Sequence, residues 1–454
     1  MKRDEYKHLL NYAANLVILI VQAVLFGYIW YRHYVPILVE LEREFWRRGN
    51  WAVIGMYVLI LFFITKTLGG YSVGYLRISD ICLSQVLALL CANAIEYVEV
   101  CIIVNDYVTP RPLLVLMAVE ILFIVPWVYV IRAIYTRLYP PRKMIVIYGE
   151  YSPTNLIGKI NSRKDKYDVC ATESVKIGYE ALYTKIMDYE AVVLCDLPSQ
   201  IRNQILKFCY DQKKRTYITP KISDIIITGT DRIHLFDTPL MLARNGGLTI
   251  EQRIGKRMLD IIFSLLAILI SSPFMIIFAL CIKFYDSGPV FYTQERVTRD
   301  GKAFQIIKFR SMRVNAEREG ARLAAKGDDR ITPIGRFLRA THLDELPQVF
   351  NILKGEMSMV GPRPERREIA EQYEELIPEF RFRLKVKAGL TGYAQIYGKY
   401  NTAPYDKLKL DLTYIERYSV WLDLKLMLMT FKIMFQKENT EGVEKEQKTA
   451  IKRM

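Results

Sequence analysis

The sequence is poor in the residues that build common metal and redox sites. It contains only four histidines in 454 residues, and they are scattered along the chain (His8, His33, His234 and His342). None of the seven cysteines forms a C-x-x-C pair, and four of them lie in apolar segments. Both patterns argue against a zinc site and a disulfide framework, so we interpret the cysteines as reduced packing residues.

Two binding signatures are also missing. No basic block is interleaved with aromatic residues as a single-strand binder needs, so no nucleic-acid partner is expected. Where a dinucleotide-binding strand would be followed by G-x-G-x-x-G, the chain reads GEYSP from Gly149. The formal net charge is nevertheless +15. In a chain with membrane segments, this excess indicates a cytosolic membrane surface and anionic substrates.

Long apolar runs dominate the first third of the chain. Four segments, near residues 13–31, 51–68, 78–104 and 113–135, each approach the ~20 residues that cross a bilayer as a helix. Lys and Arg favour the side that holds both ends of this region, which predicts a four-helix transmembrane bundle over residues 1–140 with both ends in the cytoplasm. Glu96 and Glu99 in the third segment are either a polar site in the bundle or, as we favour, carboxylates facing its interior or lying near its outer edge.

The pattern changes after residue 140. The runs MIVIYGE and AVVLCDLP are strand-like, and helical stretches follow near residues 155–162 and 199–211. Alternating strands and helices over residues 144–236 predict a small parallel, Rossmann-like α/β domain, which we assign to residues 141–245. Without the glycine fingerprint, nucleotide binding is less expected there than a structural or regulatory role.

A fifth apolar segment covers residues 254–285 and is interrupted near its middle by Ser271, Ser272 and Pro273. Proline breaks a helical hydrogen bond, and serine hydroxyls can satisfy the freed carbonyls inside lipid. Each half is roughly 20 Å long, short of the ~30 Å hydrocarbon layer. We therefore expect a re-entrant hairpin with both basic flanks on the cytosolic side, the alternative being a fifth, kinked crossing.

Residues 288–312 predict two strands, PVFYTQ and FQIIKF, joined by a turn at Arg299-Asp300-Gly301. Lys308 and Arg310 share one face of the second strand, either toward a ligand or merely toward solvent. Residues 315–326 read as a charged surface helix, and 365–382 as a second helix. Gly389, Gly392 and Gly398 mark a glycine-rich loop able to approach a ligand closely.

The residues with the clearest chemistry are the adjacent carboxylates Asp344 and Glu345. Pro347 and an apolar helical run follow them, which places the pair at a helix N-terminus, where phosphate is favoured. Arg336 and Arg339 precede the pair, and Arg363 follows between two prolines that stiffen its loop. Carboxylates beside fixed arginines suit metal-assisted chemistry on a phosphate; the plainer interpretation is a helix cap beside a solvated basic face.

Toward the C-terminus, residues 422–435 form an apolar helix with two lysines, suited to a membrane interface or to a core. Residues 438–454 form a polar tail. We expect a membrane protein, α-rich with α/β parts, whose catalytic domain spans residues 246–437 with the re-entrant helix at 254–285.

The C-terminal motifs resemble those of the bacterial sugar transferases, the large monotopic polyprenyl-phosphate phosphoglycosyl transferases. The resemblance is carried by GKRMLD, the Ser-Ser-Pro break, GPVFYTQERVTRDGKAFQIIKFRSM, RITPIGRFLRATHLDELPQVFNILKGEMSMVGPRPE and VKAGLTGYAQIYG. It covers nearly all of residues 251–435. The apolar segments and the α/β domain match the large members by layout more than by motif.

The resemblance implies an enzyme of the bacterial inner membrane with its catalytic domain on the cytoplasmic face. Such enzymes transfer a sugar-1-phosphate from a UDP-sugar to undecaprenyl phosphate, release UMP, and begin exopolysaccharide, capsule or O-antigen assembly. Asp344 would be the nucleophile that carries a phospho-sugar, and Glu345 would help to position Mg²⁺. Lys308, Arg310, Arg339 and Arg363 would offset the diphosphate charge. His342 stands where many relatives have serine.

Relatives also suggest a homodimer. Motif spacing does not identify the sugar. Two other classes stay open: a non-catalytic membrane scaffold, or a transport component of a polysaccharide export system. For transport, four short spans with Glu96 and Glu99 as the only buried charges make a poor path.

Overall fold

The computed structural model describes residues 2–42, 47–243, 246–314, 330–398 and 402–434. The expected charged helix at 315–326 and the polar tail at 438–454 lie outside these residues. The chain separates into two compact units, Met1–Thr219 and Pro220–Met454. Each unit is described by itself.

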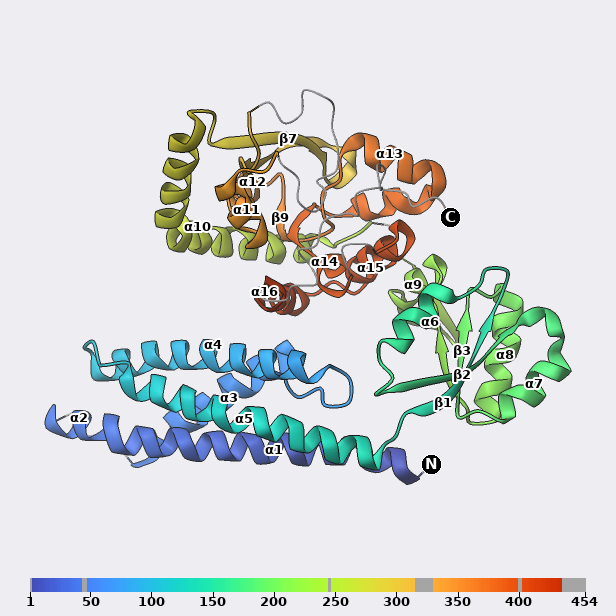
Figure 1. Ribbon diagram of the computed structural model, residues 1–454, viewed down its shortest axis with the longest axis horizontal. Helices are drawn as coiled ribbons and strands as arrows, with labels where there is room; N and C mark the ends of the chain where they lie inside the picture. Colours follow the sequence, from blue (N-terminus) through green and yellow to red (C-terminus); the bar gives the residue numbers. More distant parts are fainter. Residues whose placement is uncertain (1, 43–46, 244–245, 315–329, 399–401, 435–454) are drawn as a thin grey trace. The chain divides into compact units, whose positions relative to one another are not determined.

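The N-terminal unit begins with long apolar helices that pack against one another (Figure 1). α1 packs against α3 and α5, and α4 packs against the same two helices. We call these four the helical bundle; they are α1 (Lys2–Ile29), α3 (Arg47–Leu68), α4 (Ile78–Val104) and α5 (Arg111–Leu138). A π-helical turn, η1 (Trp30–Tyr34), and α2 (Val35–Glu40) extend α1.

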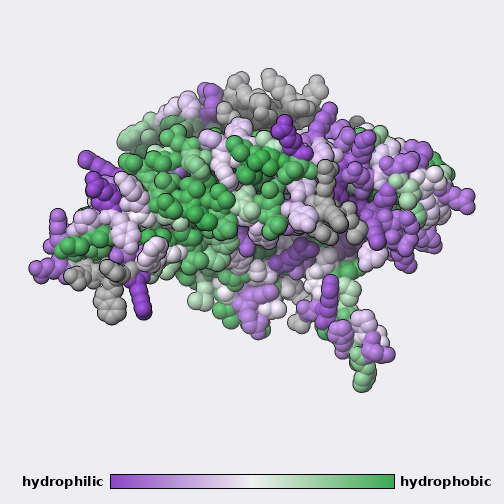
Figure 2. Space-filling model, turned by 90° about the horizontal axis from the view of Figure 1, so that it is seen from below, coloured by the Kyte–Doolittle hydropathy of each residue, from purple (hydrophilic) through white to green (hydrophobic). Residues whose placement is uncertain are grey.

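Within the described residues, five helices are long and apolar enough to cross a membrane: the four of the bundle, with α1 counted through α2, and α10. Apolar side chains cover much of the bundle surface seen in Figure 2, where the α/β domain is hydrophilic. Exposed Leu122 and Ile102 are examples of such lipid-compatible side chains. These observations fit a membrane-associated protein.

An α/β domain completes the N-terminal unit. Four parallel strands lie in the order β2-β1-β3-β4, which confirms the predicted parallel topology. The strands are β1 (Arg142–Tyr148), β2 (Tyr167–Ser174), β3 (Ala191–Cys195) and β4 (Arg215–Ile218). The helices between them are α6 (Thr154–Asn161), η2 (Val175–Ile177), α7 (Tyr179–Met187) and α8 (Ser199–Asp211). Central β1 is buried from Met144 to Ile147, as both neighbours and covering helices require.

The boundary between the two units falls after Thr219, whereas the sequence-based division ended the α/β domain at residue 245. The segment between contains α9 (Ile222–Thr228) and a hairpin of β5 (Asp231–Leu235) and β6 (Thr238–Leu242). Ile222 and Ile225 of α9 are buried in the core of the C-terminal unit, together with Leu408. Apolar burial therefore ties α9 to the chain that follows it.

The long helix α10 (Ile250–Asp286) bends sharply part-way along (Figure 1). Pro273 lies inside it and has no N–H to donate to the carbonyl of Leu269, four residues earlier. The Ser272 hydroxyl donates to that same carbonyl at 3.2 Å. The prediction that a serine satisfies the freed carbonyl is thus confirmed for Ser272, while Ser271 lies 3.4 Å from the sulfur of Met275.

The rest of the C-terminal unit is built from short elements. The predicted hairpin is confirmed: β7 (Phe291–Val297) pairs antiparallel with β8 (Ala303–Phe309), and the turn η3 (Arg299–Gly301) joins them. There follow α11 (Pro333–Ala340), η4 (Leu343–Glu345), α12 (Gln348–Lys354), β9 (Ser358–Val360), α13 (Arg367–Leu376), η5 (Pro378–Lys385), β10 (Gly389–Thr391), α14 (Tyr393–Tyr397), α15 (Pro404–Glu416) and α16 (Val420–Met434). The core joins α9, α13, α15 and α16 around Phe380 and Tyr414.

The sequence allowed the last helix, α16, to be either a core helix or a helix at a membrane interface, and it has features of both. Leu426 and Met427 are buried in the core, while Trp421 and Phe431 are largely exposed. The helix therefore belongs to the core along one face and presents large apolar side chains on another.

Glycines near β9 and β10 serve backbone packing. A Cβ on Gly389 would lie 2.0 Å from the nitrogen of Gly361, and one on Gly392 would lie 2.1 Å from the Gly361 oxygen. β9 and β10 pair in parallel here. The close approach that Gly389 and Gly392 permit in this structure is to Gly361.

Candidate active site

The carboxylate pair Asp344 and Glu345 lies on the short turn η4, between α11 and α12. Pro347 is the N-cap residue of α12, which starts at Gln348, so the pair lies just before the N-terminus of this helix. Leu343 and Leu346 flank the pair and pack against a cluster that includes Met275 of α10 and Phe309. The bent helix thus holds the turn that carries the carboxylates.

His342 provides the sharp change of direction between α11 and η4. Its φ is 57°, in the left-handed region that histidine tolerates better than bulky or branched residues. Its N–H donates to the carbonyl of Arg339, and its own carbonyl accepts from the N–H of Glu345. The sequence left the role of His342 open; the backbone role is visible here.

Glu345 is held by two cations. The Nζ of Lys308, at the end of β8, donates to Oε1 at 2.6 Å, and the Nη2 of Arg363 donates to the same oxygen at 2.8 Å. Burial alone would raise the pKa of Glu345, but Arg363 and Lys308 outweigh it and hold this pKa well below its ordinary value. Glu345 is therefore ionised and its oxygens are occupied.

Asp344 has different surroundings. Among the described residues, no hydrogen bond or ion pair reaches its carboxylate, although the side chain is half-buried. Burial and the adjacent Glu345 charge raise the pKa of Asp344, while Lys308, Arg339 and His342 act in the opposite direction. Asp344 thus offers carboxylate oxygens that no side chain of the described residues occupies.

The other predicted basic residues occupy different places. Arg339 on α11 is half-buried and acts on Asp344 through its charge. Arg336 is exposed on the same helix. Arg310 follows β8 and is buried, but it pairs with Asp286 at the end of α10. The structure therefore brings Lys308, Arg339 and Arg363 to the carboxylate pair and places Arg310 in a contact with the bent helix.

The loop that carries Arg363 is fixed from behind by a network that sequence reasoning missed. The Nη2 of Arg383 donates to the Arg363 carbonyl at 2.9 Å and pairs with Asp411 at 2.8 Å. Glu365 pairs with Lys407 and lies 3.6 Å from the Nη1 of Arg383. Burial would raise the pKa of Glu365, but Lys407 and Arg383 lower it to about 2.

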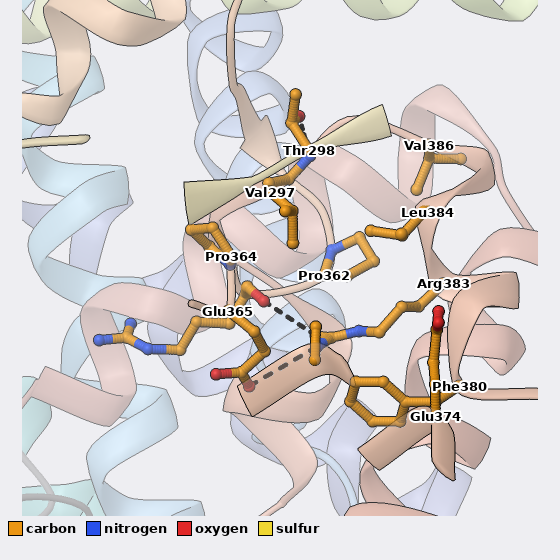
Figure 3. Close-up of a pocket in the computed structure, with 13 residues that line it drawn as sticks. Val297, Thr298, Pro362, Pro364, Glu365, Glu374, Phe380, Arg383, Leu384 and Val386 are labelled. Atoms are coloured by element: carbon orange, nitrogen blue, oxygen red, sulfur yellow. Dashed lines mark hydrogen bonds and ion pairs between the residues drawn. The ribbon is translucent and has the colours of Figure 1, made fainter. Parts of the chain in front are cut away.

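Figure 3 shows Glu365 and Arg383 pointing toward one another beside a pocket behind this loop. Pro362, Pro364, Phe380 and Val386 are among the residues that line it, whereas Asp344 and Glu345 are not. The pocket therefore backs the loop of Arg363 and is separate from the carboxylate pair.

Two residues of the GKRMLD motif connect α10 to the elements around the site. Arg257 donates to the carbonyls of Ile352 and Leu353 at 2.7 Å each, at the end of α12. Asp260 accepts from the Ser358 hydroxyl and the Met359 N–H at 2.8 Å each, on β9. An ionisable motif inside an otherwise apolar helix was the available signal for these contacts, but the partners lie too far along the chain for spacing to reveal them.

The carboxylate pair offers oxygen donors of the kind that Mg²⁺ prefers. Mg²⁺ is usually bound by one or two carboxylates together with water and substrate phosphates. Asp344 offers unoccupied oxygens, and the described residues contain no larger group of His, Cys, Asp and Glu side chains suited to a metal. Asp344, assisted by Glu345, would thus hold Mg²⁺ together with a phosphate ligand.

Comparison with known proteins assigns the part of the chain that contains this site to a family. The family model described as "Bacterial sugar transferase" matches residues 251–437. A UDP-glucose:undecaprenyl-phosphate glucose-1-phosphate transferase of Caulobacter vibrioides is 36% identical over 211 residues, which are 44% of this chain and 78% of that protein. The chain belongs to the bacterial sugar transferase family.

Two further relatives match over different lengths. A protein of the same name from Klebsiella pneumoniae is 37% identical over 263 residues, 57% of this chain and 55% of that protein. A UDP-N-acetylgalactosamine-undecaprenyl-phosphate N-acetylgalactosaminephosphotransferase from Aeromonas hydrophila is 41% identical over 180 residues, 39% of this chain and 43% of that protein. The matches thus span about half the length of these two relatives.

Proposed function

We propose that this sugar transferase moves a sugar-1-phosphate from a UDP-sugar to undecaprenyl phosphate and releases UMP. The observation that carries the proposal is the contrast between two neighbouring carboxylates. Glu345 is occupied by Lys308 and Arg363, while Asp344 presents oxygens without a partner among the described residues. The names of the Klebsiella and Aeromonas relatives support the substrate classes.

The proposed reaction has two displacements at one phosphorus atom. An oxygen of Asp344 attacks the phosphorus that bears the sugar, the bond from that phosphorus to the bridging oxygen breaks, and UMP leaves with this oxygen. An oxygen of undecaprenyl phosphate then attacks the aspartyl phospho-sugar, and the Asp344 carboxylate is released. One site can thus handle a water-soluble and a lipid substrate in turn.

The surrounding residues prepare this chemistry electrostatically. Lys308, Arg339 and Arg363 place positive charge at the pair, where a diphosphate would approach. Glu345 fixes Lys308 and Arg363 in place through its ion pairs. Mg²⁺ held at the open oxygens of Asp344, beside Glu345, would supply further positive charge to offset the diphosphate.

The membrane arrangement belongs to the same proposal. The helical bundle crosses the inner membrane, and α10 enters and leaves it on the cytoplasmic side, so the carboxylate pair meets the lipid phosphate at the membrane surface. Support comes from the apolar exposed side chains of α10, such as Leu269 and Phe274, and from the Pro273 bend. The homodimer suggested by the resemblance remains a prediction.

The test is release of UMP by the purified protein from UDP-glucose and from UDP-N-acetylgalactosamine, with and without undecaprenyl phosphate and Mg²⁺. We expect Asp344→Asn to abolish release and to prevent labelling of the protein by a UDP-sugar that carries a radioactive β-phosphate. Arg336→Gln, on the exposed face of α11, is the matched control and should keep both. Turnover by Asp344→Asn near the wild-type rate would refute the nucleophile. A protein that never releases UMP would support a scaffold instead.

A further inference from the structure

The loop between β9 and α13, residues 361–365, is held at one backbone group after another. The Gly361 N–H donates to the Thr391 carbonyl at 2.8 Å, and the Gly389 N–H donates to the Pro362 carbonyl at 2.9 Å. Both partners lie on β10, which pairs with β9 directly before the loop. The start of the loop is therefore fixed to the strands from which it emerges.

The three carbonyls that follow are occupied as well. A side chain of η5 supplies the donor for the Arg363 carbonyl. The end of β7 supplies the other two donors: the Nη1 of Arg296 donates to the Pro364 carbonyl at 3.2 Å, and the Val297 N–H donates to the Glu365 carbonyl at 3.1 Å. Four consecutive carbonyls of the loop thus have donors, which come from β10, η5 and β7.

These restraints surround a single exposed side chain. Pro362 and Pro364 are buried and have a fixed φ, whereas Arg363 between them is exposed. Its guanidinium meets Glu345 with two nitrogens, Nη2 at 2.8 Å from Oε1 and Nη1 at 3.5 Å from Oε2. A two-pronged contact of this kind depends on the orientation of the guanidinium plane. The position of the loop backbone therefore sets how Arg363 is presented at the carboxylate pair.

We propose that Arg296 is a positioning residue for the reaction: it holds the Pro364 carbonyl so that Arg363 meets the diphosphate in one orientation. This rests on the proposed function, in which Arg363 offsets the diphosphate charge. Arg296 is itself held, because its Nη2 donates to the Oε1 of Gln294 on the same strand at 2.6 Å. Displacement of a catalytic group by about 1 Å slows an enzyme by up to about a hundredfold.

Arg296 is also the side-chain donor that can be removed most cleanly. Arg383 of η5 pairs with buried Asp411, so its loss would strand a buried carboxylate and destabilise the fold. Arg296 bonds to neutral oxygens only, within the part of the chain that the structure describes. The carboxylate in its electrostatic range, Glu365, keeps its pairs with Lys407 and Arg383. A change at Arg296 therefore tests the position of the loop.

The first test is a double-mutant cycle on UMP release by the full-length protein in lipid nanodiscs. Arg296→Met removes both hydrogen bonds and keeps an apolar stem. We expect it to lower kcat about tenfold and to change KM for the UDP-sugar by less than about twofold. In an Arg363→Lys background, which has no fork to align, the same change should lower kcat by less than about twofold. An equal loss in both backgrounds would overturn the proposal, because Arg296 would then act independently of Arg363.

The matched control is Arg367→Met. Arg367 also reaches β7, through an exposed ion pair with Glu295 at 3.6 Å, and it bonds to no carbonyl of the loop among the described residues. Exposed pairs contribute little, so kcat should stay at the wild-type value. A loss of kcat as large as that of Arg296→Met would show that any contact between β7 and this region matters, and would overturn the specific role of Arg296.

The second test is amide hydrogen exchange, which needs no turnover. Arg296→Met should speed exchange in peptides that cover residues 361–366 and leave peptides of α10 and α15 unchanged, whereas general destabilisation would speed exchange in all of them. Exchange in the loop at the wild-type rate would overturn the positioning role while UMP release by the wild type still supports the proposed function. A wild type that releases no UMP would instead refute the proposed function, and with it the role of Arg296 in catalysis. If Arg296→Met fails to fold, Gln294→Leu takes its place: it removes only the acceptor that holds Arg296, and the same outcomes apply.

Discussion

Asp344 and Glu345 are neighbours in the chain but not in their electrostatic surroundings. Two cations pair with Glu345 and lower its pKa, whereas burial and the charge of Glu345 raise the pKa of Asp344. Arg339 on α11 acts on Asp344 without forming a hydrogen bond among the described residues. The removal of one neighbouring charge should therefore shift the pKa of Asp344.

We expect Arg339→Gln to move the acidic limb of the pH–rate profile to higher pH. Arg339 favours the ionised form of Asp344, so its removal raises the pKa of Asp344 further, and a higher pH is needed to ionise the nucleophile. The measurement is kcat/KM for UMP release from about pH 4 to pH 8. Arg336→Gln should leave the limb in place; identical profiles for both variants and the wild type would contradict the assigned influence of Arg339.

A second residue-scale prediction concerns Glu365, behind the loop of Arg363. Its pKa of about 2 lies below the ordinary value near 4.3, so its contribution to stability is fully present above about pH 5 and is lost as the pH falls toward 2. Glu365→Gln should lower the unfolding midpoint by several degrees at pH 7 and by much less at pH 3. The exposed Glu368→Gln on α13 is the control. A deficit that is equal at both pH values would argue that packing, not charge, is lost.

Residue types alone revealed the carboxylate pair and its basic neighbours, because Asp-Glu, Gly-Pro-Arg-Pro and the alternation around Lys308 are local patterns. They did not reveal that Lys308 and Arg363 share one oxygen of Glu345, since their positions depend on how β8 and the loop after β9 meet. Arg310 was grouped with Lys308 by alternation, yet it pairs with Asp286. The alternation of side chains along a strand shows which residues share a face, but it does not show which residue packs against that face.

At the scale of elements, α10 is the part whose sequence was most informative. Its length, its apolar character and the proline break could all be predicted from the sequence, because each depends on local chemistry. Gly389 in β10 and Gly392 directly after it could be recognised from the sequence only as flexible positions. Their contact is with Gly361, which is distant in the chain and reaches them only after the two strands pair.

Ser272 and Pro273 should behave as one unit. Ser272→Ala alone leaves the Leu269 carbonyl without its donor, which costs on the order of 1 kcal/mol in a membrane helix. In a Pro273→Ala background the N–H of residue 273 can donate to that carbonyl, so the same serine change should cost almost nothing. The readout is UMP release together with the unfolding midpoint for the two single variants and the double variant. Additive effects would disconnect the serine from the proline.

At the scale of the whole molecule, the family model matches only part of the chain. The family match covers residues 251–437 and lies in the C-terminal unit. In the Caulobacter relative, the 211 matched residues make up 78% of the protein, so most of that protein corresponds to less than half of this one. Whether the C-terminal unit acts without the bundle can be tested with fragments.

We therefore expect a fragment of residues 220–454 to release UMP in detergent or nanodiscs, and a fragment of residues 246–454 to be less stable. The shorter fragment lacks Ile222 and Ile225, which are buried in the core with Leu408. Full burial of such side chains contributes roughly 1.5–3 kcal/mol each. Unfolding midpoints of the two fragments test this; equal midpoints would show that α9 adds nothing to the catalytic unit.

The order of the large parts could be predicted from the sequence, whereas the boundary at Thr219 could not. Composition changes mark where apolar helices end and alternating strands begin, and these changes are abrupt near residue 140. α9 carries no comparable mark, because Ile222 and Ile225 would suit either neighbouring core equally well. Which core they enter is decided by partners almost two hundred residues later, such as Leu408.

The bend of α10 also has a bearing on biogenesis. The group that completes it, the Ser272 hydroxyl, stands three residues from the carbonyl that it satisfies. Because this hydrogen bond is local, we expect the bend to form without the catalytic domain, while the nascent chain is still leaving the ribosome. An isolated peptide of residues 250–286 should already be angled in micelles, as spin-label distances across Pro273 would report. The bent helix α10 would then enter the membrane already in its final shape, and the catalytic domain would assemble onto it during translation.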